Sequence, residues 1–114
     1  MRAKILNASA GSGKTYQLAY KYVRDVIDQP GLYRHILAVT FTNKATEEMK
    51  SRILKEIHRL ASGGASPYLE NLCRELSLDE RSVRKRAAEV RSKILHDYSR
   101  FTVLTIDTFF QRIL

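Results

Sequence analysis

The segment ASAGSGKT, residues 8 to 15, constrains the fold of this chain more than any other feature. Gly11 and Gly13 let the backbone turn so that successive N–H groups point at phosphate oxygens. Lys14 brings a positive charge to β- and γ-phosphates, and Thr15 offers a hydroxyl to the Mg²⁺ that accompanies them. We therefore predict a phosphate-binding loop, with Lys14 as the candidate catalytic residue and Thr15 as the candidate metal ligand. The predicted phosphate-binding residues are Ala10, Gly11, Ser12, Gly13, Lys14 and Thr15.

The flanking sequence supplies the structural context that such a loop requires. Residues 4 to 7 (KILN) indicate the end of a short strand, and apolar residues at helical spacing follow Thr15. The general pattern GxxxxGK[ST] begins with glycine, whereas this chain has Ala8. An alternative interpretation is a Gly/Ser loop that caps a helix and contains a lysine by chance. The order of strand, turn and helix favours the phosphate loop.

A second strand and a second helix follow. The first helix is expected to run from about residue 14 to residue 28, where the sequence Gln-Pro-Gly stops it. Residues 36 to 41 (ILAVTF) form an almost unbroken apolar run, which is typical of a strand buried on both faces of a parallel sheet. Thr42 and Asn43 are candidate caps for the next helix, on whose outer face Glu48 is expected to pair with Arg52. The inner stripe of this helix is Ala45, Met49, Ile53, Ile57 and Leu60. The predicted class is α/β with a parallel sheet.

Residues 62 to 100 differ in character from the segments before them. The sequence SGGASP at 62 to 67 indicates a linker, and two helices are expected at about 68 to 76 and 79 to 98, the second capped by Ser77 or Asp79. This part carries the basic residues Arg81, Arg84, Lys85, Arg86, Arg91 and Lys93. The whole chain has 20 Lys and Arg against 12 Asp and Glu, a formal net charge of +8. Such a balance favours a polyanionic partner, nucleic acid before an anionic membrane, although a basic run is also typical of a solvated surface.

The remaining sequence features concern the cellular location of the protein and whether the sequence is a fragment. A single cysteine, Cys73, cannot form an internal disulfide, no apolar run has a membrane-spanning length, and residues 1 to 4 (MRAK) do not resemble a signal peptide. We therefore expect a cytoplasmic protein without a membrane partner. Residues 101 to 106 (FTVLTI) return to strand character, and Asp107 opens an apolar helix that reaches Leu114 without a stop signal. For that reason we expect the sequence to be an N-terminal fragment.

Three blocks occur in order: ASAGSGKT at 8 to 15, ILAVTFTNKATEEMKSRI at 36 to 53, and TVLTIDTFFQRIL at 102 to 114. Together they resemble motifs I, Ia and Ib of superfamily 1 DNA helicases of the UvrD/Rep type, in which AxAGSGKT is a common form of the phosphate loop. Within that superfamily the chain most resembles the AddA/RecB-like subunits of ATP-dependent exonucleases, the exonuclease V beta type. The resemblance implies a P-loop NTPase (RecA-like) parallel sheet, incomplete here and carrying a basic helical insert. Its implied parts are a P-loop part at 1–61, the insert at 62–100, and a return strand with a helix at 101–114.

The resemblance also implies a function and roles for individual residues. A subunit of this type couples ATP hydrolysis to translocation on single-stranded DNA in double-strand-break repair. Phe41 resembles the aromatic on which a base stacks, and Thr42 and Asn43 resemble a contact between a helix N-terminus and a DNA phosphate. Thr105 and Asp107 occupy the comparable turn of the third block. The implied cofactors are ATP and Mg²⁺, and the implied partners are single-stranded DNA or DNA ends, the rest of the helicase polypeptide, and a nuclease or helicase subunit. A core position for Phe41, and a helix-cap or magnesium role for Asp107, remain open alternatives.

The chain also departs from the family pattern. The adenine-reading glutamine has no room before Met1, and the only Asp-Glu pair, at residues 79 and 80, is expected to start a helix rather than end a strand. Loss of an arginine finger alone costs about 10³ to 10⁵ in rate in phosphate-loop enzymes. We therefore expect this chain to bind nucleotide weakly and to hydrolyse it poorly. Two alternatives stay open: a nucleotide or small-molecule kinase of the P-loop class, and a non-enzymatic basic module that binds nucleic acid.

Overall fold

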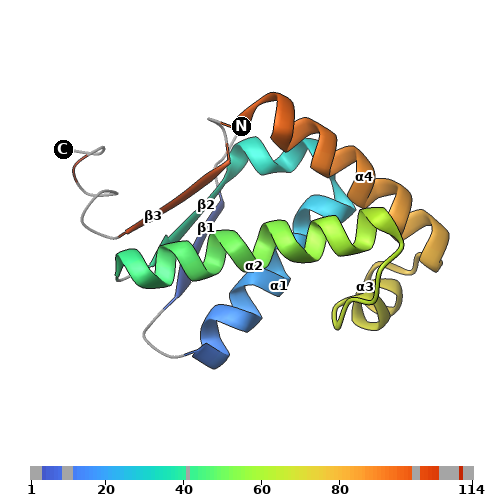
Figure 1. Cartoon of the computed structure of the whole chain (residues 1–114), viewed down its shortest axis with the longest axis horizontal. Helices are drawn as coiled ribbons and strands as arrows, with labels where there is room; N and C mark the ends of the chain where they lie inside the picture. Colours follow the sequence, from blue (N-terminus) through green and yellow to red (C-terminus); the bar gives the residue numbers. More distant parts are fainter. Residues whose placement is uncertain (1–3, 9–11, 41, 99–100, 106–110, 112–114) are drawn as a thin grey trace.

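The computed structural model describes residues 4–8, 12–40, 42–98, 101–105 and 111. Within these residues, parallel strands alternate with helices (Figure 1). The elements are β1 (Lys4–Ala8), α1 (Ser12–Asp28), the 3-10 helix η1 (Pro30–His35), β2 (Ile36–Thr40), α2 (Asn43–Ser62), α3 (Leu69–Leu76), α4 (Glu80–His96) and β3 (Thr102–Thr105). The predicted α/β class with a parallel sheet is confirmed. None of the helices in the described part of the chain combines the length and apolarity needed to cross a bilayer.

The sheet has the order β1-β2-β3, so that β2 is the central strand. Lys4 pairs with Ile36 at the start of β1, and Leu37 pairs with Thr102 at the start of β3. Four of the five β2 side chains are described, and all four are buried: Ile36, Ala38, Val39 and Thr40. This continuous burial confirms the strand type that the unbroken apolar run predicts.

The helices pack against one another beside the sheet. Figure 1 shows α2 running away from the strands, α3 near the far end of α2, and α4 returning along α2 towards β3. A single buried cluster joins the inner faces of α1, α2 and α4 to the sheet. The stripe predicted for α2 is confirmed at Met49, Ile53, Ile57 and Leu60, whereas Ala45 is only half-buried. The division of the sequence into three parts stays a prediction.

One predicted charge pair on α2 is wrong. Arg52 does not pair with Glu48, which is exposed. Its Nη1 atom lies 3.5 Å from Oε2 of Glu56, one turn further along the helix. Glu56 is fully buried, although helical periodicity alone gives no reason to bury a carboxylate at this position. Arg59 also reaches Glu56, with 3.4 Å between Nη1 and Oε2.

Two basic residues of α4 bind the ends of other helices. Nη1 of Arg84 donates hydrogen bonds to the carbonyls of Leu60, at 3.1 Å, and Gly64, at 3.0 Å, where α2 ends. Nη1 of Arg86 donates to the carbonyl of Asp28, at 2.9 Å, where α1 ends. A cation at a helix C-terminus meets both unpaired carbonyls and the negative end of the helix dipole. The solvated surface predicted for this basic run therefore does not hold for Arg84 and Arg86, which join α4 to α1 and α2.

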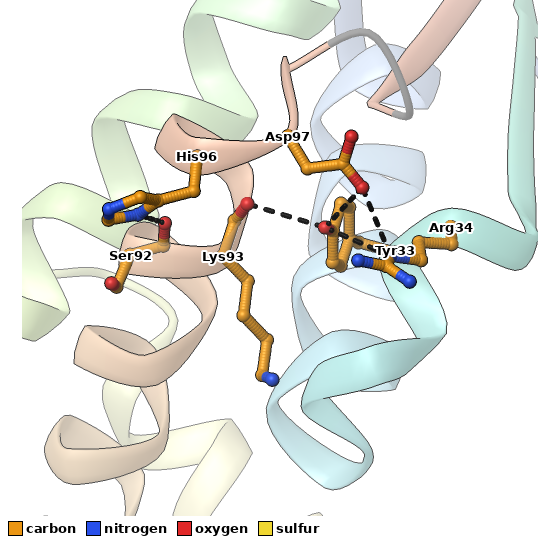
Figure 2. A pocket seen from close by; sticks show the side chains of 6 residues that line it. All are labelled: Tyr33, Arg34, Ser92, Lys93, His96 and Asp97. Carbon is orange, nitrogen blue, oxygen red and sulfur yellow. Dashed lines mark hydrogen bonds and ion pairs between the residues drawn. The ribbon is translucent and has the colours of Figure 1, made fainter.

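A polar cluster ties the end of α4 to η1 (Figure 2). The Tyr33 hydroxyl donates to Oδ2 of Asp97 at 3.1 Å, and Nε of Arg34 lies 3.1 Å from the same oxygen. These residues line a cavity of about 550 Å³. Lys93 and His96 also line the cavity, but their side chains point away from Asp97 (Figure 2). The cluster joins η1, which leads into β2, to the C-terminal end of α4.

Candidate nucleotide and nucleic-acid site

The strands of the three sequence blocks end at the same edge of the sheet. Ala8 at the end of β1 pairs with Thr40 at the end of β2, and Thr40 pairs with Thr105 at the end of β3. Because all three strands are parallel, the segment that follows each strand starts from the carboxyl edge. Neighbouring strands lie about 4.8 Å apart, so these starting points are about 5 to 10 Å from one another. In open α/β sheets, this edge is where ligands bind.

Four of the predicted phosphate-binding residues open α1. Ser12, Gly13, Lys14 and Thr15 are its first four residues, and the first turn carries no acidic residue. The first four N–H groups of a helix have no partner within the helix, and the helix dipole is positive at this end. The backbone of Ser12–Thr15 therefore suits a bound phosphate. Ala10 and Gly11 lie outside the described residues.

The second block is organised by the first turn of α2. Thr42 is the N-cap of this helix, and its hydroxyl accepts a hydrogen bond from the backbone N–H of Ala45 at 3.0 Å. The capping role predicted for Thr42 is therefore confirmed. Thr42, Asn43 and Lys44 are all exposed at this helix end. Phe41, the predicted stacking residue, lies outside the described residues.

A buried hydroxyl pair supports this turn, and sequence reasoning did not predict it. The hydroxyls of Thr40 and Thr46 lie 2.5 Å apart, and each also lies within hydrogen-bond distance of the carbonyl of Thr42, at 3.2 Å and 3.1 Å. One hydroxyl donates to the other, which in turn donates to this carbonyl. Thr40 is 1% exposed and Thr46 is 7% exposed, so the bond between their hydroxyls forms away from water. The spacing of threonines in TFTNKAT was the available signal. The pair joins the last residue of β2 to the first turn of α2.

The third block is described only in part. Thr105 ends β3 and is half-buried, whereas Asp107 lies outside the described residues. The carboxylate of Asp79 accepts a hydrogen bond from the N–H of Ser82 at 2.8 Å and caps α4. Hydrogen bonds from Ser82 hold the pKa of Asp79 below its ordinary value. As predicted, the pair Asp79-Glu80 starts a helix and does not follow a strand.

Comparison with known proteins gives this arrangement a family. The sequence matches the family model of the UvrD/REP helicase N-terminal domain over residues 2–114. The chain belongs to this family. The RecBCD enzyme subunit RecB of Escherichia coli (strain K12) is 31% identical over 119 residues, which cover 97% of this chain and 10% of the relative. An ATP-dependent helicase/nuclease subunit of Bacillus mycoides (strain KBAB4) is 36% identical over 76 residues, 65% of this chain and 6% of the relative.

A further relative extends the likeness to another bacterial group. The RecB subunit of Chlamydia trachomatis serovar D is 33% identical over 112 residues, 86% of this chain and 11% of the relative. The chain thus spans about a tenth of the length of the curated relatives that it matches. No solved structure matches it. The resemblance to UvrD/Rep-type helicases and to AddA/RecB-like subunits is confirmed, and membership of the UvrD/REP family favours a helicase over a kinase.

Proposed function

We propose that this chain is the ATP-binding part of a DNA helicase subunit that couples ATP hydrolysis to translocation on single-stranded DNA in double-strand-break repair. One observation carries the proposal: β1, which leads into the phosphate loop, and β2, which leads into the TFTN segment, are paired neighbours that end together. Ala8 at the end of β1 pairs with Thr40 at the end of β2. A nucleotide and a DNA strand would therefore be held on adjacent segments of one sheet edge. The likeness to RecB and to the helicase/nuclease subunit of Bacillus mycoides supports the same function.

The proposed fold is that of a P-loop NTPase, with the phosphate loop between β1 and α1. Backbone N–H groups from Ala10 to Gly13 would hold phosphate oxygens, Lys14 would neutralise the β- and γ-phosphates, and the Thr15 hydroxyl would bind Mg²⁺. The absence of acidic residues from the first turn of α1 fits this role, since nothing of like charge competes with phosphate. ATP, when bound, supplies the phosphoanhydride bond whose hydrolysis drives movement.

The proposed DNA contacts lie one strand away. Phe41 would stack on a base, and the exposed N-terminus of α2, with Thr42 and Asn43, would hold a DNA phosphate. Thr105 and Asp107 would extend the track along the same edge. Because Ala8 and Thr40 are register partners, a shift of the phosphate loop would act directly on the turn before α2.

The partners and the rate of hydrolysis are also proposals. We assign no catalytic Asp-Glu pair and no arginine finger within residues 1–114, so the chain alone should bind ATP and hydrolyse it poorly. The rest of a helicase polypeptide would supply these groups, and a partner nuclease or helicase subunit would complete the assembly. A cytoplasmic location fits this role.

The test measures nucleotide binding and its coupling to DNA in the same protein. Lys14→Ala should weaken binding of a fluorescent ATP analogue with Mg²⁺ by about tenfold or more, because a charged contact to phosphate is lost. Lys21→Ala, an exposed position on the same helix, should change it by less than about twofold.

The second part of the test measures how nucleotide affects DNA binding, with a fluorescent single-stranded oligonucleotide. Mg²⁺-ATP should shift the affinity of the wild-type chain for this DNA, and the shift should vanish in Lys14→Ala while DNA binding itself persists. DNA binding that weakens with salt but ignores both ATP and Lys14→Ala would instead identify a non-enzymatic binding module.

A further inference from the structure

Five residues form a closed ring of contacts against the first turns of α1. They come from α1, from α2 and from the segment that leads into α3, and we call the ring the tyrosine clasp: Tyr16, Arg52, Glu56, Ser66 and Tyr68. Tyr16 follows Lys14 and Thr15 directly in the chain and lies in the second turn of α1. The clasp therefore meets α1 next to the residues that are proposed to hold nucleotide.

Tyr68 connects the helical segment to the backbone of α1. Its hydroxyl donates to the main-chain carbonyl of Tyr16 at 3.1 Å, across 52 positions of sequence. Its ring meets the rings of Tyr16 and Tyr20 edge to face, with 5.2 Å between centroids in both pairs. Burial raises the pKa of Tyr68, so its hydroxyl stays protonated and acts as a donor. Tyr68 is 1% exposed and is therefore packed on all sides.

Glu56 holds Tyr68 in place from the side of α2. Ser66 Oγ donates to Oε1 of Glu56 at 3.1 Å and accepts the backbone N–H of Tyr68 at 3.2 Å. Arg52 closes the ring, because it pairs with Glu56 and lies over the ring of Tyr16, 5.2 Å from the centroid. Burying a carboxylate is costly unless it is paired and hydrogen-bonded, so the members of the clasp depend on one another.

We propose that Tyr68 is a positioning residue for the phosphate loop: through its bond to the Tyr16 carbonyl, the clasp fixes the first turns of α1 in the conformation that binds Mg²⁺-nucleotide. This inference rests on the proposed function. Through this bond, the segment between α2 and α4 affects the affinity for nucleotide. The tyrosine hydroxyl acts on backbone, so neither Tyr68 nor Glu56 needs to touch the nucleotide.

Tyr68→Phe isolates this bond, because it removes only the hydroxyl and keeps the ring. Loss of one hydrogen bond of about 1 kcal/mol corresponds to about fivefold weaker binding of Mg²⁺-ATP. In the ligand-free chain, amides of residues 16 to 20 should exchange hydrogen faster than in wild type. The matched control is Tyr20→Phe, whose hydroxyl bonds to Oε1 of Glu75 at 2.7 Å and not to the backbone of α1. Tyr20→Phe should leave Mg²⁺-ATP binding and the amide exchange of residues 16 to 20 unchanged, even if it lowers the melting temperature.

The outcomes separate the two proposals. If wild type binds Mg²⁺-ATP in a Lys14-dependent way and Tyr68→Phe binds it equally well, the clasp has no positioning role. An equal loss in Tyr20→Phe would also overturn the inference, because a general loosening of α1 would then explain the effect. If Lys14→Ala binds as wild type does, the proposed function fails and the inference with it. Should Tyr68→Phe not fold, Ser66→Ala replaces it and carries the same expectations.

Discussion

At the scale of single residues, the hydroxyls of two buried tyrosines, Tyr22 and Tyr33, differ in whether they have hydrogen-bond partners in the described part of the chain. Tyr33 donates to Asp97 and receives the Nε–H of Arg34 at 3.2 Å. Tyr22 is fully buried, and its hydroxyl has no hydrogen-bond partner among the described residues. Burial raises the pKa of Tyr22, so the hydroxyl stays neutral. A paired and an unpaired hydroxyl contribute to stability with opposite sign.

A pair of Tyr→Phe substitutions tests this difference. Tyr33→Phe should lower the free energy of unfolding by about 1 kcal/mol, because Asp97 and Arg34 lose a partner. Tyr22→Phe should raise it by up to about 1 kcal/mol, because a buried polar atom without a partner is removed. Urea denaturation followed by circular dichroism measures both. A loss of stability in Tyr22→Phe as large as that in Tyr33→Phe would contradict the assignment.

At the scale of elements, hydrogen bonds hold several helix ends. Thr42 and Asp79 cap the starts of α2 and α4. Gly63 ends α2 with φ of 83°, a left-handed conformation that glycine adopts without strain. Arg84 and Arg86 then bind the carbonyl ends of α2 and α1. Each of these helix boundaries is thereby fixed by a specific hydrogen bond.

The Asp79 cap gives α4 a pH-dependent contribution to stability. Because hydrogen bonds lower the folded-state pKa of Asp79, its contribution is fully present above the unfolded-state value of about 3.9 and is lost as pH falls through the folded-state value. Asp79→Ser should keep a capping oxygen and most of the stability at pH 7. Its unfolding free energy should fall less steeply than that of wild type below about pH 4. Urea titrations from pH 7 to pH 3 compare the unfolding free energies of wild type and Asp79→Ser. An identical pH dependence of the two proteins below about pH 4 would contradict the prediction.

At the scale of the whole molecule, one buried cluster spans the segments before and after the 62–67 linker. Ile94 of α4 is 1% exposed and belongs to the same cluster as Tyr22 of α1 and Val103 of β3. A cavity at the end of α4 should therefore weaken the sheet as well as the helices. The helical segment and the strands are expected to unfold as one unit.

Ile94→Ala tests this cooperativity. The substitution should lower the free energy of unfolding by about 2 to 5 kcal/mol, as cavities in close-packed cores do. Helix loss by circular dichroism and tyrosine fluorescence should shift together in one transition. Leu95→Ala, at a neighbouring side chain that is 70% exposed, should have little effect. Two separated transitions in Ile94→Ala would mean that the helical segment unfolds independently.

The sequence allowed the elements to be predicted better than their long-range contacts. Helical periodicity and apolar runs located α1, β2 and α4, and capping chemistry identified Thr42 and Asp79, because all of these are local signals. The partners of Arg84 and the burial of Glu56 were missed, since they depend on which helices come together. For the candidate site, the motifs predicted the residues, and the strand register added that the three strands end at a common edge, from which the site segments start. The roles of the site residues remain predictions.

The central position of β2 also sets an order of events during synthesis. β1 and β2 are separated only by α1 and η1, whereas β3 leaves the ribosome after α2, α3 and α4. At about 5 to 20 residues per second, the third strand follows the second by roughly 3 to 12 s. Helices form in microseconds, so α2 and α3 have time to form before β3 emerges. Until β3 emerges, the edge of β2 that it pairs with lacks a strand partner in the nascent chain, and the shared core of helices and sheet is incomplete.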